Sequence, residues 1–160
     1  MVMDAKQTVM ALYSAYATGD AEEISHWLHD EVVWTAPAGN ATQVALGLGR
    51  PEDAGLPRGA NDLDRDAIVA FMAYNFARFF GGVENSFRTV VADGDVVVVE
   101  HTLSATLPNG RSYVNDYCFV YEVRGAKVWR IREYMDTRGG WAQVFGEDEP
   151  VQLVEFVRGR

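Results

Sequence analysis

The stretch VVVVEHTLSATLPNGRSYVNDYCFVYEVRGAKVWRIREYMD, residues 96–136, carries the clearest structural pattern in the chain. Through most of it polar and apolar residues alternate, which is the pattern of a β-strand with one buried face. The alternation is interrupted at Asn109-Gly110 and Gly125-Ala126, and Asn-Gly is the strongest short signal for a β-hairpin. We therefore predict three long antiparallel strands, at residues 96–107, 112–123 and 127–136.

The first turn determines which side chains of its two strands share a face. A two-residue loop at Asn109-Gly110 would pair Glu100 with Phe119 across the hairpin. The same face would also hold Thr102, Ser104, Asn115 and Tyr117. His101 would lie on the opposite face, beside Cys118, with a role in the core or at a dimer interface.

The second turn allows two registers. A two-residue Gly125-Ala126 loop would turn one set of side chains toward Phe119: Arg132, Tyr134 and Asp136. A three-residue loop or one β-bulge would turn the other set toward it: Trp129, Ile131, Glu133 and Met135. We favour the second register because its set is apolar apart from Glu133. Glu100 and Glu133 would then lie two strand spacings apart, about 9.6 Å at Cα.

The N-terminal half predicts three helices, at residues 4–18, 21–28 and 65–80. Each segment carries apolar residues at helical spacing. Gly19 ends the first helix. Asp20 caps the second, and Glu23 completes an Asp-x-x-Glu pattern that resembles a capping box.

The remaining segments connect these elements. Short strands at 32–35 and 86–92 are expected before the long meander. Residues 38–61 are rich in glycine and proline, and a connection this long in a compact domain is usually functional or disordered. We expect a rim or lid there, with a short strand at 44–46. The C-terminal region is expected to add a helical turn at 141–145 and a strand at 151–157.

The overall composition excludes several classes of function. A chain of 160 residues with 48% hydrophobic content fits one globular domain. Its net charge of −9 argues against nucleic acid, which needs a basic face. The single cysteine, Cys118, excludes an internal disulfide and is consistent with a reducing cytoplasm. The N-terminus has no apolar signal region, and no stretch approaches the roughly 18 apolar residues of a membrane span. We expect a cytoplasmic protein without nucleic acid or membrane partners.

Glu133 is the strongest candidate for chemistry. A carboxylate that loses hydration in an apolar pocket has a raised pKa and can exchange protons near neutral pH. Glu100 is the second candidate, because two carboxylates in one pocket raise one of the two pKa values. The alternative for each is an ion pair with an arginine of the sheet, such as Arg132.

Other side chains are expected to contact a ligand. Asn115 and Tyr117 could donate hydrogen bonds to a carbonyl or hydroxyl group, or could pack across the hairpin against Ser104 and Thr102. Thr102 is included in the predicted binding surface. Its apolar wall is expected to consist of Phe71, Met72, Phe76 and Phe119.

No metal or cofactor is expected. His26, His29 and Asp30 have the spacing of a metal-binding helix face, but no third strong ligand is evident. Cys118 and His101 lack the third, orienting group of a nucleophilic pair. The run Gly47-Leu48-Gly49-Arg50 lacks the strand-to-helix context of a phosphate loop.

Three helices, a glycine-rich rim and a long meander of four strands together resemble the nuclear transport factor 2-like superfamily, in its SnoaL-like branch. The most specific segments are DEVVWT at 30–35, GRSYVNDY at 110–117 and IREYMD at 131–136. The resemblance implies an α+β fold over residues 1–160, a cone-like curved antiparallel sheet with three N-terminal helices enclosing a pocket. It also implies a homodimer through the outer sheet face. It leaves the reaction open, because this fold carries isomerases, hydrolases, cyclases and non-catalytic modules.

Two groups within the superfamily bear on the acidic residues. Limonene epoxide hydrolase looks similar over the last two hairpins, and its catalytic Arg and two Asp residues would fall on Glu100, Thr102 and Glu133. Glu100 and Thr102 are unsuitable for activating water against an epoxide, because Glu100 replaces a fixed cation with an acid and Thr102 cannot ionise. The phenazine-biosynthesis proteins end the strand with an Arg-Glu-Phe-Met sequence similar to Arg132-Glu133-Tyr134-Met135, which places their acid on Glu133.

The leading hypothesis is a cofactor-independent acid/base enzyme of the isomerase, cyclase or lyase type that acts on a small, largely apolar metabolite. Glu133 would move the proton, while Glu100, Asn115 or Tyr117 would position it. The alternative is a non-catalytic domain that binds a small ligand or serves as a dimeric accessory; epoxide hydrolysis fits less well. Dimerisation is expected through an apolar outer face of Val97, Val99, Leu103, Val114, Cys118 and Val120.

Overall fold

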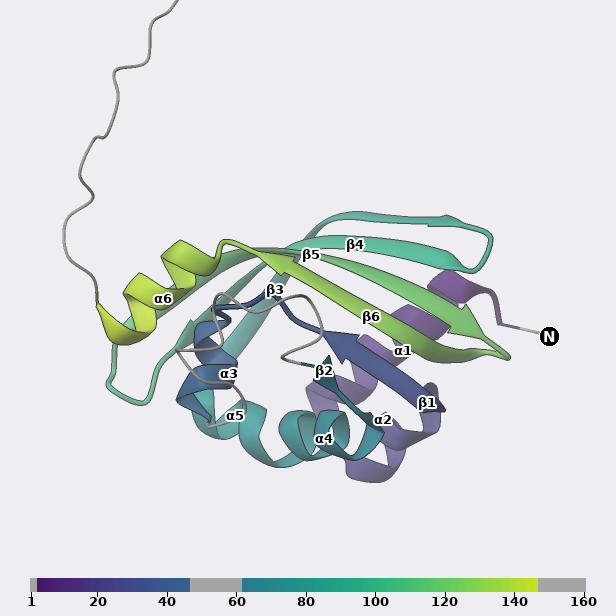
Figure 1. The fold of residues 1–160 in the computed structure, drawn as a ribbon, viewed down its shortest axis with the longest axis horizontal. Coiled ribbons are helices and arrows are strands. Elements are labelled where there is room, and N and C mark those ends of the chain that lie inside the picture. The colour runs from purple at the N-terminus through teal and green to yellow at the C-terminus, as the bar shows by residue number, and fades with distance from the viewer. Residues whose placement is uncertain (1–2, 47–61, 147–160) are drawn as a thin grey trace, which may run out of the picture.

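The computed structural model describes residues 3–46 and 62–146 and has an α+β fold built on one curved sheet (Figure 1). Its six strands run in the order β2-β1-β6-β5-β4-β3. They are β1 (Leu28–Thr35), β2 (Asp62–Leu63), β3 (Gly81–Asp93), β4 (Val96–Thr106), β5 (Ser112–Arg124) and β6 (Lys127–Met135). The sheet is antiparallel except where β1 pairs in parallel with β6. The predicted meander is therefore confirmed, and one parallel pair is added to it.

The first two helices follow their capping residues. Helix α1 (Ala5–Thr18) is capped by Asp4, and Gly19 ends it in the left-handed conformation at φ 68°. Asp20 caps α2 (Ala21–Trp27) through the backbone N–H groups of Glu22 and Glu23. The Glu23 carboxylate accepts instead from the hydroxyl of Thr18, so the reciprocal bond of a capping box is absent at this helix.

The third predicted helix contains a change of winding. It consists of α4 (Arg65–Ala70), a π-helical turn η2 (Phe71–Asn75) and α5 (Phe76–Phe79). The Asn75 side chain donates to the carbonyl of Ala70, which gives a partner to a backbone oxygen beside the π turn. π turns are frequently found at functional sites, and this one holds apolar residues at the inner face of the sheet.

The register of the β4–β5 hairpin differs from the prediction by one residue. Leu107 pairs with Arg111 around a three-residue loop, and His101 pairs with Tyr117. Proline favours the second position of a type I turn, which Pro108 occupies, and Gly110 follows with φ 81°. Because side chains alternate along a strand, this single residue moves every predicted β4 side chain to the other face.

The β5–β6 hairpin has the favoured register. Gly125 and Ala126 form a two-residue turn with φ of 57° and 58°. A β-bulge at Trp129 then shifts the pairing, so that Phe119 lies opposite Glu133. Glu133 therefore faces inward, as predicted.

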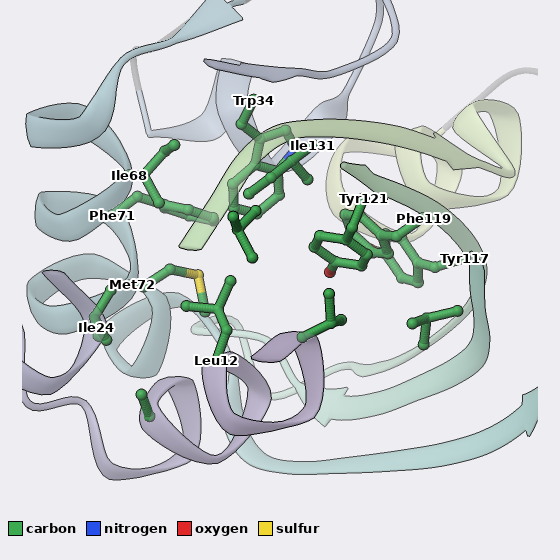
Figure 2. Packing of buried hydrophobic residues seen from close by; sticks show 14 of the residues in the cluster. Leu12, Ile24, Trp34, Ile68, Phe71, Met72, Tyr117, Phe119, Tyr121 and Ile131 are labelled. Carbon is green, nitrogen blue, oxygen red and sulfur yellow. The ribbon is translucent and has the colours of Figure 1, made fainter. Parts of the chain in front are cut away.

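Helices and sheet enclose one apolar core. Figure 2 shows Tyr117, Phe119 and Tyr121 on β5 facing Leu12 from α1 and Phe71 from η2. The prediction of the outer face was wrong for three residues that are buried inside: Val97, Val99 and Leu103. It was right for Val114, Cys118 and Val120 on β5, which point outward.

The connecting segments differ in part from expectation. Residues 44–46 do not form a strand, because Asn40 caps a short helix there, α3 (Ala41–Ala45). The predicted turn at 141–145 is part of α6 (Thr137–Phe145). The rest of the predicted rim, 47–61, and the predicted strand at 151–157 lie outside the described residues. No helix in the described ranges is long and apolar enough to cross a membrane.

Candidate active site

The inner face of the sheet and the helices enclose a cavity of about 400 Å³. Aromatic residues make up much of its wall, and a few polar side chains project among them. This composition is typical of small-molecule sites. The wall includes Tyr13, Tyr16, Trp34, Asn40, Gln43, Phe71, Met72, Phe76, His101, Tyr117, Phe119, Tyr121 and Glu133.

Glu133 lies in this wall and is held by two neutral donors. The indole N–H of Trp34 donates to Oε2 at 2.9 Å, and Nδ2 of Asn40 donates to Oε1 at 3.0 Å. Oδ1 of Asn40 accepts from the backbone N–H of Gln43, which fixes the orientation of the amide. The two hydrogen bonds therefore fix the orientation of the Glu133 carboxylate within the cavity wall.

The electrostatics of Glu133 favour proton exchange near neutral pH. The residue is 6% exposed, and in the described part of the chain it forms no salt bridge. Burial raises the pKa of Glu133 to about 7, while the hydrogen bonds from Trp34 and Asn40 oppose the rise. A general base is most effective when its pKa lies near the working pH.

Five of the predicted binding residues line the cavity: Phe71, Met72, Phe76, Tyr117 and Phe119. Asn115 is buried behind them. Its Nδ2 donates to the hydroxyl of Tyr113 and to the carbonyl of Asp136, so both amide protons are used. Tyr113 and Tyr117 share a hydrogen bond of 2.8 Å between their hydroxyls. Either hydroxyl can be the donor in this bond, and when Tyr113 donates, the proton of Tyr117 is available to the cavity.

The prediction that Glu100 and Thr102 share the pocket with Glu133 was wrong. Both residues lie on the outer face, since the three-residue loop puts Glu100 opposite Cys118 and Thr102 opposite Asp116. Glu100 accepts from the hydroxyl of Thr89. Thr102 and Asp116 share a hydrogen bond and both contact Arg88. The prediction that Cys118 lies beside His101 fails for the same reason.

Sequence reasoning missed several residues of the site. Trp34 and Asn40 are 99 and 93 positions away from Glu133 in the chain, and only the parallel pairing of β1 with β6 brings them close. His101 was assigned to the wrong face, and the Pro108 signal for a type I turn could have corrected this assignment. Arg132, considered as a partner for Glu133, pairs with Glu122 instead.

Of the residues with metal-like spacing, His26, His29 and Asp30, two have other partners. Nδ1 of His29 accepts from the backbone N–H of Glu31, and Asp30 forms an ion pair with Arg65. Within residues 3–46 and 62–146, no group of three or more His, Cys, Asp or Glu side chains could hold a metal ion.

Comparison with known proteins identifies related folds. The sequence profile of the SnoaL-like domain matches residues 9–131. Comparison with curated proteins found no match.

Solved structures give the same fold at low sequence identity. An NTF2-like protein of unknown function from Burkholderia pseudomallei K96243 has 22% identity and a TM-score of 0.69, covering 89% of this chain and 99% of its own. IdmH, a putative polyketide cyclase from Streptomyces antibioticus, has 19% identity and a TM-score of 0.67 over 89% and 99% of the two chains. A protein with a ketosteroid isomerase-like fold from Catenulispora acidiphila DSM 44928, in complex with trimethylamine, has 13% identity and a TM-score of 0.63 over 86% and 92%. At these identities the likeness establishes the fold alone.

Proposed function

The chain belongs to the SnoaL-like domain family of the NTF2-like superfamily, and we propose that it is a cofactor-independent acid/base enzyme of the isomerase, cyclase or lyase type. Its substrate is a small, largely apolar molecule that carries a carbonyl group. The observation that carries the proposal is Glu133, a buried carboxylate in an aromatic cavity, bound by two neutral donors and with a pKa of about 7.

In the proposed reaction the Glu133 carboxylate removes a proton from a carbon next to the carbonyl. The C–H bond breaks, its electron pair moves toward the carbonyl oxygen, and an enolate forms while Glu133 becomes a carboxylic acid. Where a C=C bond adjoins the carbon that lost the proton, the enolate is a dienolate, and returning the proton to its far carbon completes an isomerisation that moves the double bond next to the carbonyl. Attack of the enolate carbon on a second carbonyl completes a cyclisation, in which Glu133 protonates the new alkoxide. The hydroxyl of Tyr117 donates to the enolate oxygen when Tyr113 is the donor in the bond between the two hydroxyls.

The fold of IdmH and of the Catenulispora acidiphila protein supports this class of reaction by analogy. The aromatic wall supports an apolar substrate, since it offers few partners to charged groups. Epoxide hydrolysis is less well supported, because Glu100 and Thr102, two of the three positions that correspond to its catalytic groups, lie on the outer face.

Proton transfer can be measured on 2-tetralone, a flat bicyclic ketone with an acidic CH₂ group, by following deuterium incorporation from D₂O with NMR. The protein should accelerate exchange, and Glu133→Gln should lower the catalysed rate at least about 100-fold with the fold intact by circular dichroism. Glu100→Gln is the matched control, because this carboxylate lies on the outer face, and it should exchange like the wild type. No acceleration by the wild type, or full activity of Glu133→Gln, would contradict the proposal and favour a domain that only binds its ligand.

A homodimer through the outer face of the sheet is part of the proposal. Val114 is 51% exposed there, and Val98, Cys118 and Val120 on the same face are partly exposed. Sedimentation at micromolar concentration should give a dimer, and Val114→Glu should weaken it by placing a charge in the contact. A monomeric wild type in this experiment would exclude the interface.

A further inference from the structure

His101 is a buried polar side chain that lacks a side-chain partner in the described structure. Its ring lies in the cavity wall on β4 and is 3% exposed. Among residues 3–46 and 62–146 neither Nδ1 nor Nε2 forms a well-aligned hydrogen bond, and the weak contact with the backbone of Thr102 leaves at least one of the two nitrogens free. Buried polar groups in native proteins are nearly always paired, so an unpaired imidazole nitrogen in a cavity wall calls for an explanation.

Two further polar atoms of the same cavity share this property. The hydroxyl of Tyr16 on α1 and Oε1 of Gln43 on α3 are buried and have no hydrogen-bond partner in the described ranges. Three elements thus contribute unpaired polar atoms to one largely apolar cavity. A ligand with its own hydroxyl or carbonyl groups would give these atoms partners.

The state of His101 fits a neutral contact with a ligand. Burial lowers its pKa to about 4, so the imidazole is uncharged at physiological pH. A neutral imidazole has one nitrogen that donates and one that accepts. His101 can therefore bind a hydroxyl group through either nitrogen, or a carbonyl oxygen through its N–H.

His101 lies far from Glu133 on the inner face. Glu133 on β6 pairs with Phe119 on β5, and His101 on β4 pairs with Tyr117, two residues from Phe119 along β5. Two strand spacings across the sheet and two residues along it separate their Cα atoms by about 12 Å. A ligand that meets both side chains must be elongated.

The rings between these two residues define how such a ligand lies. His101, Tyr117, Phe119 and Tyr121 are nearly parallel, with neighbouring centroids 5.5 to 5.8 Å apart. A ligand ring could lie between two of them only if their planes were about 7 Å apart, which is twice the usual carbon–carbon contact distance. A ligand therefore lies across the edges of the rings, and Trp34 and Phe71 pack on the side of the cavity near Phe119.

We propose that His101 is a specificity-determining residue that binds a hydroxyl or carbonyl oxygen at the end of the substrate remote from Glu133. The substrate is then a flat, mainly apolar molecule of two or more fused rings with an oxygen substituent at each end. That the end near Glu133 is the reacting end rests on the proposed function. That His101 binds an oxygen at the other end is independent of it.

Three probes of one shape test this assignment: naphthalene, 2-naphthol and 2,6-dihydroxynaphthalene, with binding measured by calorimetry. The wild type should bind the diol about tenfold more tightly than 2-naphthol. His101→Phe keeps a flat ring between Tyr117 and Phe119 and should bring this ratio close to one, with naphthalene bound as in the wild type. His26→Phe changes a histidine on α2 outside the cavity and should keep the ratio. A full diol preference in His101→Phe, or no binding of any probe to the wild type, would overturn the assignment.

A second test of the His101 assignment uses the wild type, so it does not require that a variant folds. The imidazole ¹⁵N resonances of His101 should shift on addition of the diol and shift much less with naphthalene, while those of His26 and His29 stay unchanged. Equal shifts with both probes would overturn the assignment. Glu133→Gln should retain the diol preference although it loses proton transfer. If the wild type prefers the diol but catalyses no proton transfer, the proposed function of Glu133 is refuted and the assignment of His101 stands.

Discussion

The carboxylate of Glu133 depends on two residues that were not expected from the local sequence. Trp34 and Asn40 both donate to this buried carboxylate, and without these two bonds its charged form would be costly. With both donors present the charged form remains accessible near pH 7. Two neutral donors thus keep the pKa of Glu133 in the range that suits a general base. A paired arginine would lower this pKa further and make Glu133 a weaker base.

Trp34→Phe should raise the pH at which proton transfer begins. The variant keeps an aromatic ring against Phe71 and Phe119 but removes the N–H that stabilises the charged carboxylate. The midpoint of the pH–rate profile for deuterium exchange should move upward from about 7 by about one pH unit. Trp129→Phe is the control, because Trp129 stacks with Arg124 and Arg130 away from the cavity. An unchanged midpoint in Trp34→Phe would show that this hydrogen bond does not set the pKa.

At the scale of elements, each long hairpin carries one residue more than a regular two-residue turn requires. In the β4–β5 hairpin the extra residue is in the loop, where Pro108 precedes Asn109-Gly110. In the β5–β6 hairpin it is Trp129 in a bulge. The Trp129 bulge turns Glu133 toward the cavity. His101 faces the same cavity because the loop takes up Pro108, so that Leu107 rather than Pro108 pairs with Arg111.

Deletion of Pro108 should leave the β4–β5 register unchanged. Leu107 and Arg111 would then flank Asn109-Gly110 as a two-residue type I′ turn, so His101 would still face the cavity. Binding of 2,6-dihydroxynaphthalene should persist, and urea unfolding should change by less than about 1 kcal/mol. Deletion of Ser104 within β4 is the contrasting change, since it moves one end of the strand to the other face and should abolish binding. Loss of binding on deletion of Pro108 would contradict the role given to this loop.

The elements that the sequence predicts well are those with local causes. Asp4, Gly19 and Asp20 determine helix ends through contacts within a few residues, and the favoured register of β6 follows from its own apolar pattern. The face of β4 was assigned from the turn alone, and this was wrong. Its run of four valines lacks alternation, but beyond it the polar residues Glu100, Thr102 and Ser104 alternate with His101, Leu103 and Ala105, which are the buried set. The donors to Glu133 depend on pairing between segments about 100 residues apart, for which the chain has no local signal.

At the scale of the whole molecule, two buried titratable groups act on stability in opposite directions. The pKa of Glu133 rises on folding from 4.5 to about 7, so the stability it contributes is present below pH 4.5 and is lost as the pH rises through 7. The pKa of His101 falls from 6.5 to about 4, so its contribution is present above pH 6.5 and is lost as the pH falls through 4. Each shift corresponds to about 3 kcal/mol, and the two contributions nearly cancel between pH 4 and 7.

Single substitutions should therefore reveal pH dependences that the wild type conceals. Relative to the wild type, Glu133→Gln should gain stability by up to about 3 kcal/mol between pH 4.5 and 7, because the cost of charging the buried carboxylate is removed and only the contribution of His101 varies with pH. His101→Phe should change in the opposite sense and lose relative stability over a similar range, since only the contribution of Glu133 then varies. Urea unfolding at half-unit pH steps measures both differences, with Glu100→Gln as a carboxylate control on the outer face. Parallel curves for Glu133→Gln and the wild type would mean that Glu133 titrates alike in the folded and unfolded chain, and the acid/base role proposed for it would lose its physical basis.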